Sequence, residues 1–182
     1  MTTPIAKTES YLDAISAVEV ASPSTKSLGP LYLAAHGPKM QAVAASRADG
    51  VLTYLMSPAH TQLTKVRVGP NADINVVCVL LAETDSTKAR KTAREALAYY
   101  LGLDYYHREW RKLGFSDRDF SDGGSDELID MLVGWGNKES LRAHMENHEA
   151  AGATRIIIMP LTSGESSFSR DNPVLEALAP HA

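Results

Sequence analysis

The 182-residue sequence contains a single cysteine, Cys78, and no long apolar run. One cysteine excludes an intramolecular disulfide and a zinc knuckle, and a chain without disulfides is expected in the reducing cytoplasm. The first residues, MTTPIAKTESYLDA, lack the basic start and the apolar core of an export signal. The apolar runs fall far short of the ~18 residues that cross a bilayer. We therefore expect a cytoplasmic protein with no membrane partner.

Basic residues are not in excess either. Lys and Arg number 18 against 22 Asp and Glu, which gives a formal net charge of −4. Without a concentrated basic face, the sequence gives no reason to expect a nucleic-acid partner. Hydrophobic residues make up 44% of the chain and charged residues 22%, a composition that argues against disorder. The length suits one domain with a full core.

Short apolar segments alternate with amphipathic ones along the chain. We expect four buried strands, at 31–36, 51–56, 74–82 and 154–161. Amphipathic segments between them predict helices, and this alternation predicts an α/β fold with adjacent parallel strands. Four strands fit either a small open α/β sandwich or half of a (β/α)8 barrel, and composition leaves both open.

The segment AAHGPKM joins the first strand to the next helix. Pro38 suits the first helical position, and the free N–H groups of a helix start can bind a phosphate. His36 lies at the carboxyl end of the strand, and Lys39 could add a positive charge. We expect Gly37 to allow a positive φ and a close approach to an anion. The alternative is an ordinary turn, because neither GxxxxGK[ST] nor GxGxxG is present.

The segment TYLMS ends the second strand. Tyr54 and Met56 alternate with their neighbours, so this pair could line the pocket of a flat ring. The alternative interpretation is simple core packing.

The remaining titratable side chains predict little chemistry. His144 and His148 have the i, i+4 spacing of zinc ligands, but the sequence is HMENHE and offers no third ligand nearby. We expect these histidines on an exposed helix face, Glu109 on a similar solvated face, and no metal site. Cys78 lies inside an apolar strand and is interpreted as a small buried hydrophobe.

Residues 30–58 resemble the luciferase-like monooxygenase superfamily, and most closely its deazaflavin-dependent oxidoreductases, which use coenzyme F-420. The resemblance lies in PLYLAAHGPKM, a strand, turn and helix start, and in the later ADGV that leads into the next strand. It continues through 95–115 and 150–161, and covers about residues 28–161.

This resemblance implies a (β/α)8 barrel of which only the second half, strands five to eight, is present. Residues 1–27 would then be an N-terminal helix and linker, and residues 28–182 the luciferase-like C-terminal half-barrel. A chain of this kind looks truncated or split. It is expected to need a partner, either a second copy in a homo-oligomer or a complementary N-terminal half.

The resemblance also implies a cofactor, coenzyme F-420 or alternatively FMN, above the carboxyl ends of the strands. Its phosphate would lie near Ala35, His36, Gly37, Pro38 and Lys39. The substrate pocket would include Thr53, Tyr54, Met56 and Ser57. Because the proton-handling residues of the family come mostly from the first half, no catalytic residue is named in this chain.

The expected function is therefore hydride transfer between coenzyme F-420 and a small organic substrate. One alternative is an FMN-dependent monooxygenase, which oxygen uptake would distinguish from a deazaflavin enzyme. The other is a non-catalytic half-barrel that serves as a binding or dimerising module.

Overall fold

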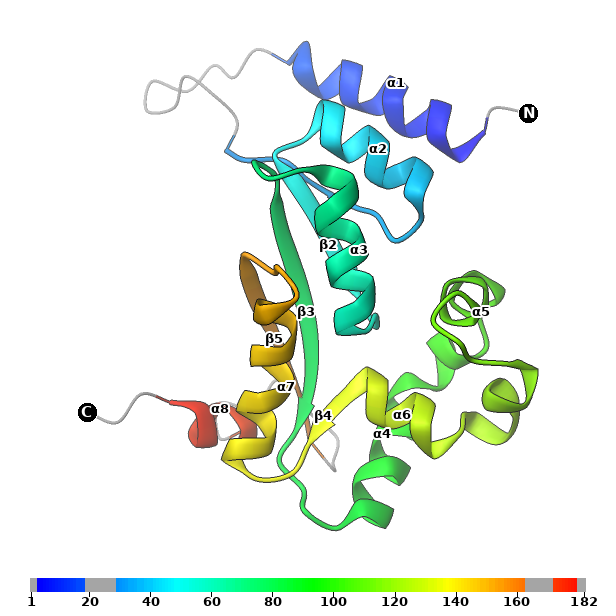
Figure 1. Ribbon diagram of the computed structural model, residues 1–182, viewed down its shortest axis with the longest axis vertical. Helices are drawn as coiled ribbons and strands as arrows, with labels where there is room; N and C mark the ends of the chain where they lie inside the picture. The colour runs from blue at the N-terminus through cyan, green and yellow to red at the C-terminus, as the bar shows by residue number, and fades with distance from the viewer. Residues whose placement is uncertain (1–2, 19–28, 163–171, 180–182) are drawn as a thin grey trace.

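A computed structural model describes residues 3–18, 29–162 and 172–179. Its sheet contains five strands within these residues, and every pair is parallel (Figure 1). The strands are β1 (Tyr32–Ala34), β2 (Gly50–Tyr54), β3 (Asp73–Leu81), β4 (Val133–Trp135) and β5 (Arg155–Leu161). The helices are α1 (Pro4–Ser16), α2 (Pro38–Arg47), α3 (Pro58–Val68), α4 (Ser86–Leu101), α5 (Asp104–Arg111), the 3-10 helix η1 (Asp117–Gly123), α6 (Asp126–Leu132), α7 (Lys138–Ala150) and α8 (Pro173–Leu178).

The α/β fold with parallel strands is confirmed. The expected strands lie side by side in the order β1, β2, β3, β5. Local signals start the helices as predicted: a proline opens α2 and α3, and the side chain of Asp85 accepts a hydrogen bond from the N–H of Lys88 at the start of α4. The expected boundary at residue 27 lies outside the described residues.

The amphipathic pattern of residues 126–135 predicts one continuous helix, but the structure ends the helix at Leu132 and forms the short strand β4 after it. This strand pairs with Val79–Leu81 of β3, while β5 pairs with the other edge of β3 over Asn75–Leu81. Since β2 already pairs with Asp73–Val77, β2 and β4 follow one another along the same edge of β3. An apolar run this short does not distinguish helix from strand by its periodicity, which is why the strand was missed.

Alternate residues of β3 face two different cores. Ile74, Val76, Cys78 and Leu80 pack on the side that carries α2, α3 and α7. Val79 and Leu81 face the other way, into a cluster formed with α4, α5 and α6. These three helices gather beyond the carboxyl ends of the strands (Figure 1). They therefore cover the end of the sheet where sites form in α/β folds.

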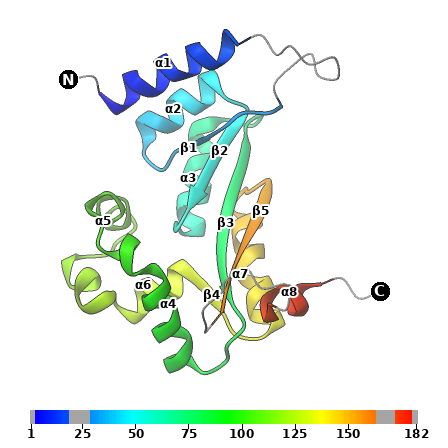
Figure 2. The ribbon, with the colours of Figure 1, turned by 180° about the vertical axis from the view of Figure 1, so that it is seen from behind.

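The rest of that second face is less well covered. Leu52, Val77 and Ile157 occupy neighbouring positions on it, and we call these three residues the open face. Ile157 is 39% exposed. In the described part of the chain, β1 pairs only with β2 and β5 only with β3, so both outer edges of the sheet are unpaired (Figure 2).

A polar layer lies at the amino ends of the strands. Arg155 donates hydrogen bonds to the Oδ1 of Asn75 at 2.9 Å and to the hydroxyl of Tyr32 at 3.3 Å. The Tyr32 hydroxyl in turn donates to the Oδ2 of Asp73 at 2.8 Å. These bonds join β1, β3 and β5 and so help to fix their register. Among the described helices, none combines the length and the apolar character that crossing a membrane requires.

Candidate functional site

The turn between β1 and α2 presents an uncapped helix start. Gly37 is the N-cap residue of α2, and within the described ranges no side chain caps the first N–H groups there. Its φ of −83° is an ordinary value, so Gly37 does not use the positive φ that a glycine allows. Lys39 is exposed at the surface. The turn thus keeps its free donors, as an anion site requires, without any special backbone conformation.

A carboxylate already lies beside this turn. A Cβ placed on Gly37 would be 3.6 Å from the Oε1 of Glu109, a side chain of α5. Glu109 is only 7% exposed, and Lys112 donates to both of its oxygens at 2.7 and 2.8 Å. The expectation of a solvated face at Glu109 is therefore wrong. As arranged, the turn fits this internal carboxylate, and a phosphate would compete with it for the same place.

His36 is the buried centre of the site. Its Nε2 accepts a hydrogen bond from the backbone N–H of Tyr54 at 3.1 Å. Its carbonyl accepts from the Nε2 of His60 at 2.9 Å and from the side-chain amide of Gln41 at 3.0 Å. The imidazole stacks on Tyr105 with a centroid distance of 5.7 Å. His36 therefore links the carboxyl ends of β1 and β2 to the helices that cover them.

The protonation state of His36 follows from these contacts. Burial, with a smaller effect from His60, lowers the pKa of His36 to about 4, so the ring is neutral at pH 7. Because Nε2 accepts a hydrogen bond, the proton resides on Nδ1. This Nδ1 is buried and has no hydrogen-bond partner among the residues that the structure describes. It is an orphaned donor of the kind that a ligand can satisfy.

A polar layer under the turn holds its carbonyls in place. The side-chain amide of Gln41 lies within 3.3 Å of the carbonyl of Ala35 and 2.9 Å of the hydroxyl of Thr64. Arg67 donates to the Oε1 of Gln41 at 3.2 Å. The sequence analysis did not identify these side chains as part of the site. A buried glutamine inside an amphipathic helix is the signal that could have found them.

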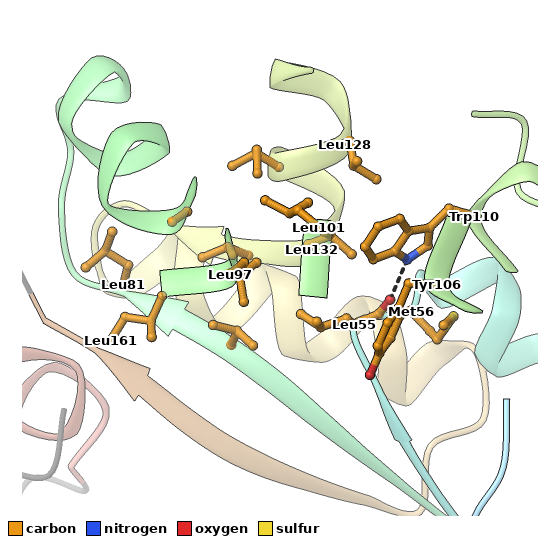
Figure 3. Packing of buried hydrophobic residues seen from close by; sticks show 14 of the residues in the cluster. Leu55, Met56, Leu81, Leu97, Leu101, Tyr106, Trp110, Leu128, Leu132 and Leu161 are labelled. Carbon is orange, nitrogen blue, oxygen red and sulfur yellow. Dashed lines mark hydrogen bonds between the residues drawn. The ribbon is translucent and has the colours of Figure 1, made fainter. Parts of the chain in front are cut away.

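The tip of β2 has an unusual backbone. Leu55 has φ 57°, in the left-handed region that bulky residues rarely adopt. Its carbonyl accepts a hydrogen bond from the indole N–H of Trp110 at 2.9 Å (Figure 3). The bend interrupts the strand alternation, and Leu55 and Met56 are both buried in the same core. Strain of this type is often found beside functional sites.

The other predicted pocket residues lie on different sides of β2. The side chain of Thr53 is fully buried on the face of the sheet that packs against α2, α3 and α7. Tyr54 points to the opposite face, where its ring meets Tyr100 at 5.2 Å. Ser57 accepts a hydrogen bond from the N–H of His60 and caps α3. Tyr54 is therefore the residue of this set nearest to the open face.

His144 and His148 are not on an exposed helix face. His148 is 1% exposed and His144 is half-buried, so that expectation is wrong. The sequence did contain the signal, because Leu141, Met145 and His148 form an i, i+4, i+7 stripe. Cys78, as expected, is buried, and burial raises the pKa of its thiol to about 12. A thiol in this state is not an activated nucleophile.

Comparison with known proteins gives a likeness of fold. No family model matches the sequence, and no curated protein matches it. The F420-dependent tetrahydromethanopterin reductase of Methanopyrus kandleri is a solved structure that is similar to the chain, with 18% sequence identity and a TM-score of 0.53. The match covers 76% of this chain and 46% of the reductase.

A second similar structure is that of apo-MsnO8, with 15% identity, a TM-score of 0.48, and coverage of 85% of this chain and 52% of that one. The chain thus spans about half the length of the solved structures that it matches. The likeness to the reductase supports the fold class: an α/β fold of parallel strands and helices, consistent with part of a (β/α)8 barrel.

Proposed function

We propose that this chain contributes one half of a luciferase-like barrel that transfers hydride between coenzyme F-420 and a small organic substrate. The observation that carries the proposal is the neutral His36, whose unpartnered Nδ1–H lies at the carboxyl ends of two strands beside the uncapped start of α2. The fold shared with an F420-dependent reductase supports the choice of cofactor.

In this proposal the cofactor supplies the redox chemistry, and the chain binds and orients it. The residues assigned to its phosphate are Ala35, His36, Gly37, Pro38 and Lys39. The residues assigned to the substrate pocket are Thr53, Tyr54, Met56 and Ser57. Because Glu109 now lies against Gly37, phosphate binding requires this carboxylate to move away, and Lys112 can then pair with the phosphate instead.

The proposal includes a partner that completes the barrel, either a complementary N-terminal half or a second copy of the chain. Two features support it. The open face leaves apolar side chains partly exposed, and the outer edges of β1 and β5 are unpaired among the described residues. Exposed sheet edges and apolar patches are typical of surfaces that pair with another chain.

Titration with F-420 and with FMN, read by fluorescence and absorbance, tests the cofactor assignment. We expect saturable F-420 binding that weakens more than tenfold in His36→Phe, which keeps a ring but removes both the Nδ1–H and the Nε2 acceptor of the Tyr54 N–H. The matched control is His107→Phe, whose imidazole binds the carbonyl of Leu101 and stacks on Phe120. Preferential FMN binding with oxygen uptake would instead identify a monooxygenase.

A non-catalytic binding or dimerising module is the second candidate. The carboxylate of Glu109 favours it, because this group occupies the place that a cofactor phosphate would need. If neither cofactor binds to the chain assembled with its complementary half or with itself, the enzyme assignment is wrong and the module assignment holds.

A further inference from the structure

Three potential metal ligands meet between β3 and α7. Cys78 comes from β3, and His144 and His148 come from successive turns of α7. Each offers one ligand atom, and the three atoms lie within 4.8 Å of one another. The thiol and the His148 ring are 1% exposed, and the His144 ring is half-buried. The cluster lies on the face of β3 opposite to the open face, and it includes none of the residues assigned to the cofactor or to the substrate pocket.

A hydrogen bond prepares one ring of the cluster for a metal. The hydroxyl of Thr61 donates to the carbonyl of Ser57 at 3.5 Å, which leaves its oxygen free to accept. The Nδ1 of His148 lies 2.9 Å from that oxygen, and in the Nδ1–H tautomer it donates to it. In this tautomer the lone pair of His148 is on Nε2. Metal-binding histidines are commonly oriented in this way by a partner on their second nitrogen.

Gly134 makes room for the second ring. A Cβ at Gly134 of β4 would lie 2.6 Å from the Cγ of His144, much closer than two non-bonded carbon atoms can approach. A surface cavity of about 300 Å³ reaches His144 and is also lined by Trp135, Ser140 and Asn147. This cavity supplies an entry path for an ion and space for a water molecule.

We propose that Cys78, His144 and His148 bind one Zn²⁺ ion, with a water molecule from the cavity as the fourth ligand. One thiolate and two imidazoles form a ligand set that zinc prefers. Bond lengths of about 2.0–2.3 Å in a tetrahedron require ligand atoms about 3.3–3.7 Å apart. The present separation, up to 4.8 Å, therefore closes by about 1 Å on binding, mainly through the half-buried ring of His144.

Titration of the untagged, reduced protein with Co²⁺ and Zn²⁺ tests this site. We expect one Co²⁺ per chain, with a sulfur-to-cobalt charge-transfer band and the intense visible bands of tetrahedral Co²⁺. Zn²⁺ should displace the Co²⁺. Cys78→Ser should abolish the charge-transfer band, and His144→Asn should weaken Zn²⁺ binding more than tenfold. His107→Asn, which changes a histidine of α5 outside the cluster, should leave the charge-transfer band and the affinity for Zn²⁺ unchanged.

Three results would overturn the proposal. They are the absence of a charge-transfer band, an affinity for Zn²⁺ that His144→Asn leaves unchanged, or several weakly bound ions per chain that Cys78→Ser does not affect. If circular dichroism shows that Cys78→Ser is unfolded, His144→Asn and Thr61→Val decide the question. Thr61→Val removes the partner of His148 while conserving volume, and should weaken binding without removing a ligand. An unchanged affinity in both variants refutes the site.

Discussion

Gly37 has an ordinary helical N-cap conformation, so its importance at the residue scale depends on space and not on strain. We predict that Gly37→Val weakens F-420 binding more than tenfold, or about 1.4 kcal/mol. The branched side chain would block the approach of a phosphate to the N–H groups of α2. Because its Cβ would meet only Glu109 at 3.6 Å, the melting temperature should change little.

Cofactor titration together with a thermal melt measures this prediction. Lys39→Ala is the matched control. It should weaken F-420 binding less than tenfold, because this exposed side chain contributes only a solvent-screened charge. Unchanged F-420 affinity in folded Gly37→Val would show that the segment is an ordinary turn.

Glu109 competes with any anion at the same turn. We predict that Glu109→Gln tightens F-420 binding severalfold, since it removes a negative charge beside the helix start and frees Lys112. The measurement is titration at low ionic strength. Glu95→Gln, which removes an exposed carboxylate of α4, should have no effect. Weaker binding in Glu109→Gln would mean that the carboxylate supports the site.

The sequence predicted some of these residues better than others. His36 was identified because strand ends carry sites in α/β folds, which is a property of local order along the chain. Glu109 and Gln41 were not, because helical periodicity tells which side of a helix is apolar, and not what that side packs against. The left-handed backbone at Leu55 has no signal in its own side chain, since it depends on the distant Trp110.

At the scale of elements, the contact between α5 and β2 has the largest expected effect on the free energy of unfolding. Trp110 is fully buried, and its N–H satisfies the buried carbonyl of Leu55. We predict that Trp110→Phe lowers the free energy of unfolding by about 2–4 kcal/mol, from the unsatisfied carbonyl and the lost volume. Urea denaturation measures the change.

Trp135→Phe is the matched control for this substitution. The indole of Trp135 donates to the half-buried carboxylate of Asp130, which water and Arg90 can still satisfy. Trp135→Phe should therefore lower the free energy of unfolding by clearly less than Trp110→Phe does. Equal losses in the two variants would show that the bond to Leu55 has no special role.

Periodicity predicted most elements, and the failures have a common cause. Strands 74–82 and 154–161 were found because long β-branched runs are distinctive. The short β4 was missed because three residues carry no period, and its pairing with β3 depends on the helices that precede it. The gathering of α4, α5 and α6 over the strand ends is likewise a tertiary property.

At the scale of the whole molecule, buried histidines tie stability to pH. Burial is the main factor that lowers the pKa of His36 and of His148 to about 4, below the 6.5 of an unfolded histidine. Between these values the unfolded chain binds more protons, so the free energy of unfolding rises with pH from about 4 to 6.5 and is level above 6.5. Each histidine contributes up to about 1.4 kcal/mol per pH unit.

Urea denaturation of the metal-free protein between pH 4.5 and pH 7.5 tests this dependence. His148→Gln, which keeps a polar group near Thr61, should reduce the dependence of the free energy of unfolding on pH. If the free energy of unfolding of the wild-type protein stays constant or falls as the pH rises over this range, the assignment of both rings as neutral is wrong.

The open face gives the last prediction, which concerns association. Leu52, Val77 and Ile157 form an apolar surface next to two unpaired sheet edges in the described part of the chain. Burying apolar area gains about 25 cal/mol per Å², so contact between two such faces is favourable. We therefore predict that the chain on its own self-associates with rising concentration, or binds the dye ANS as a loosely packed state does.

Sedimentation velocity over a range of concentrations, with ANS fluorescence, measures this association. Ile157→Asp places a charge on the open face and should shift the chain toward monomer, because burying an unpaired carboxylate is costly. The matched control is Val66→Asp. Val66 is 79% exposed on α3, on the helical side of the sheet, so its substitution should leave association unchanged. A cooperative monomer that does not bind ANS at any concentration would show that the open face needs no partner.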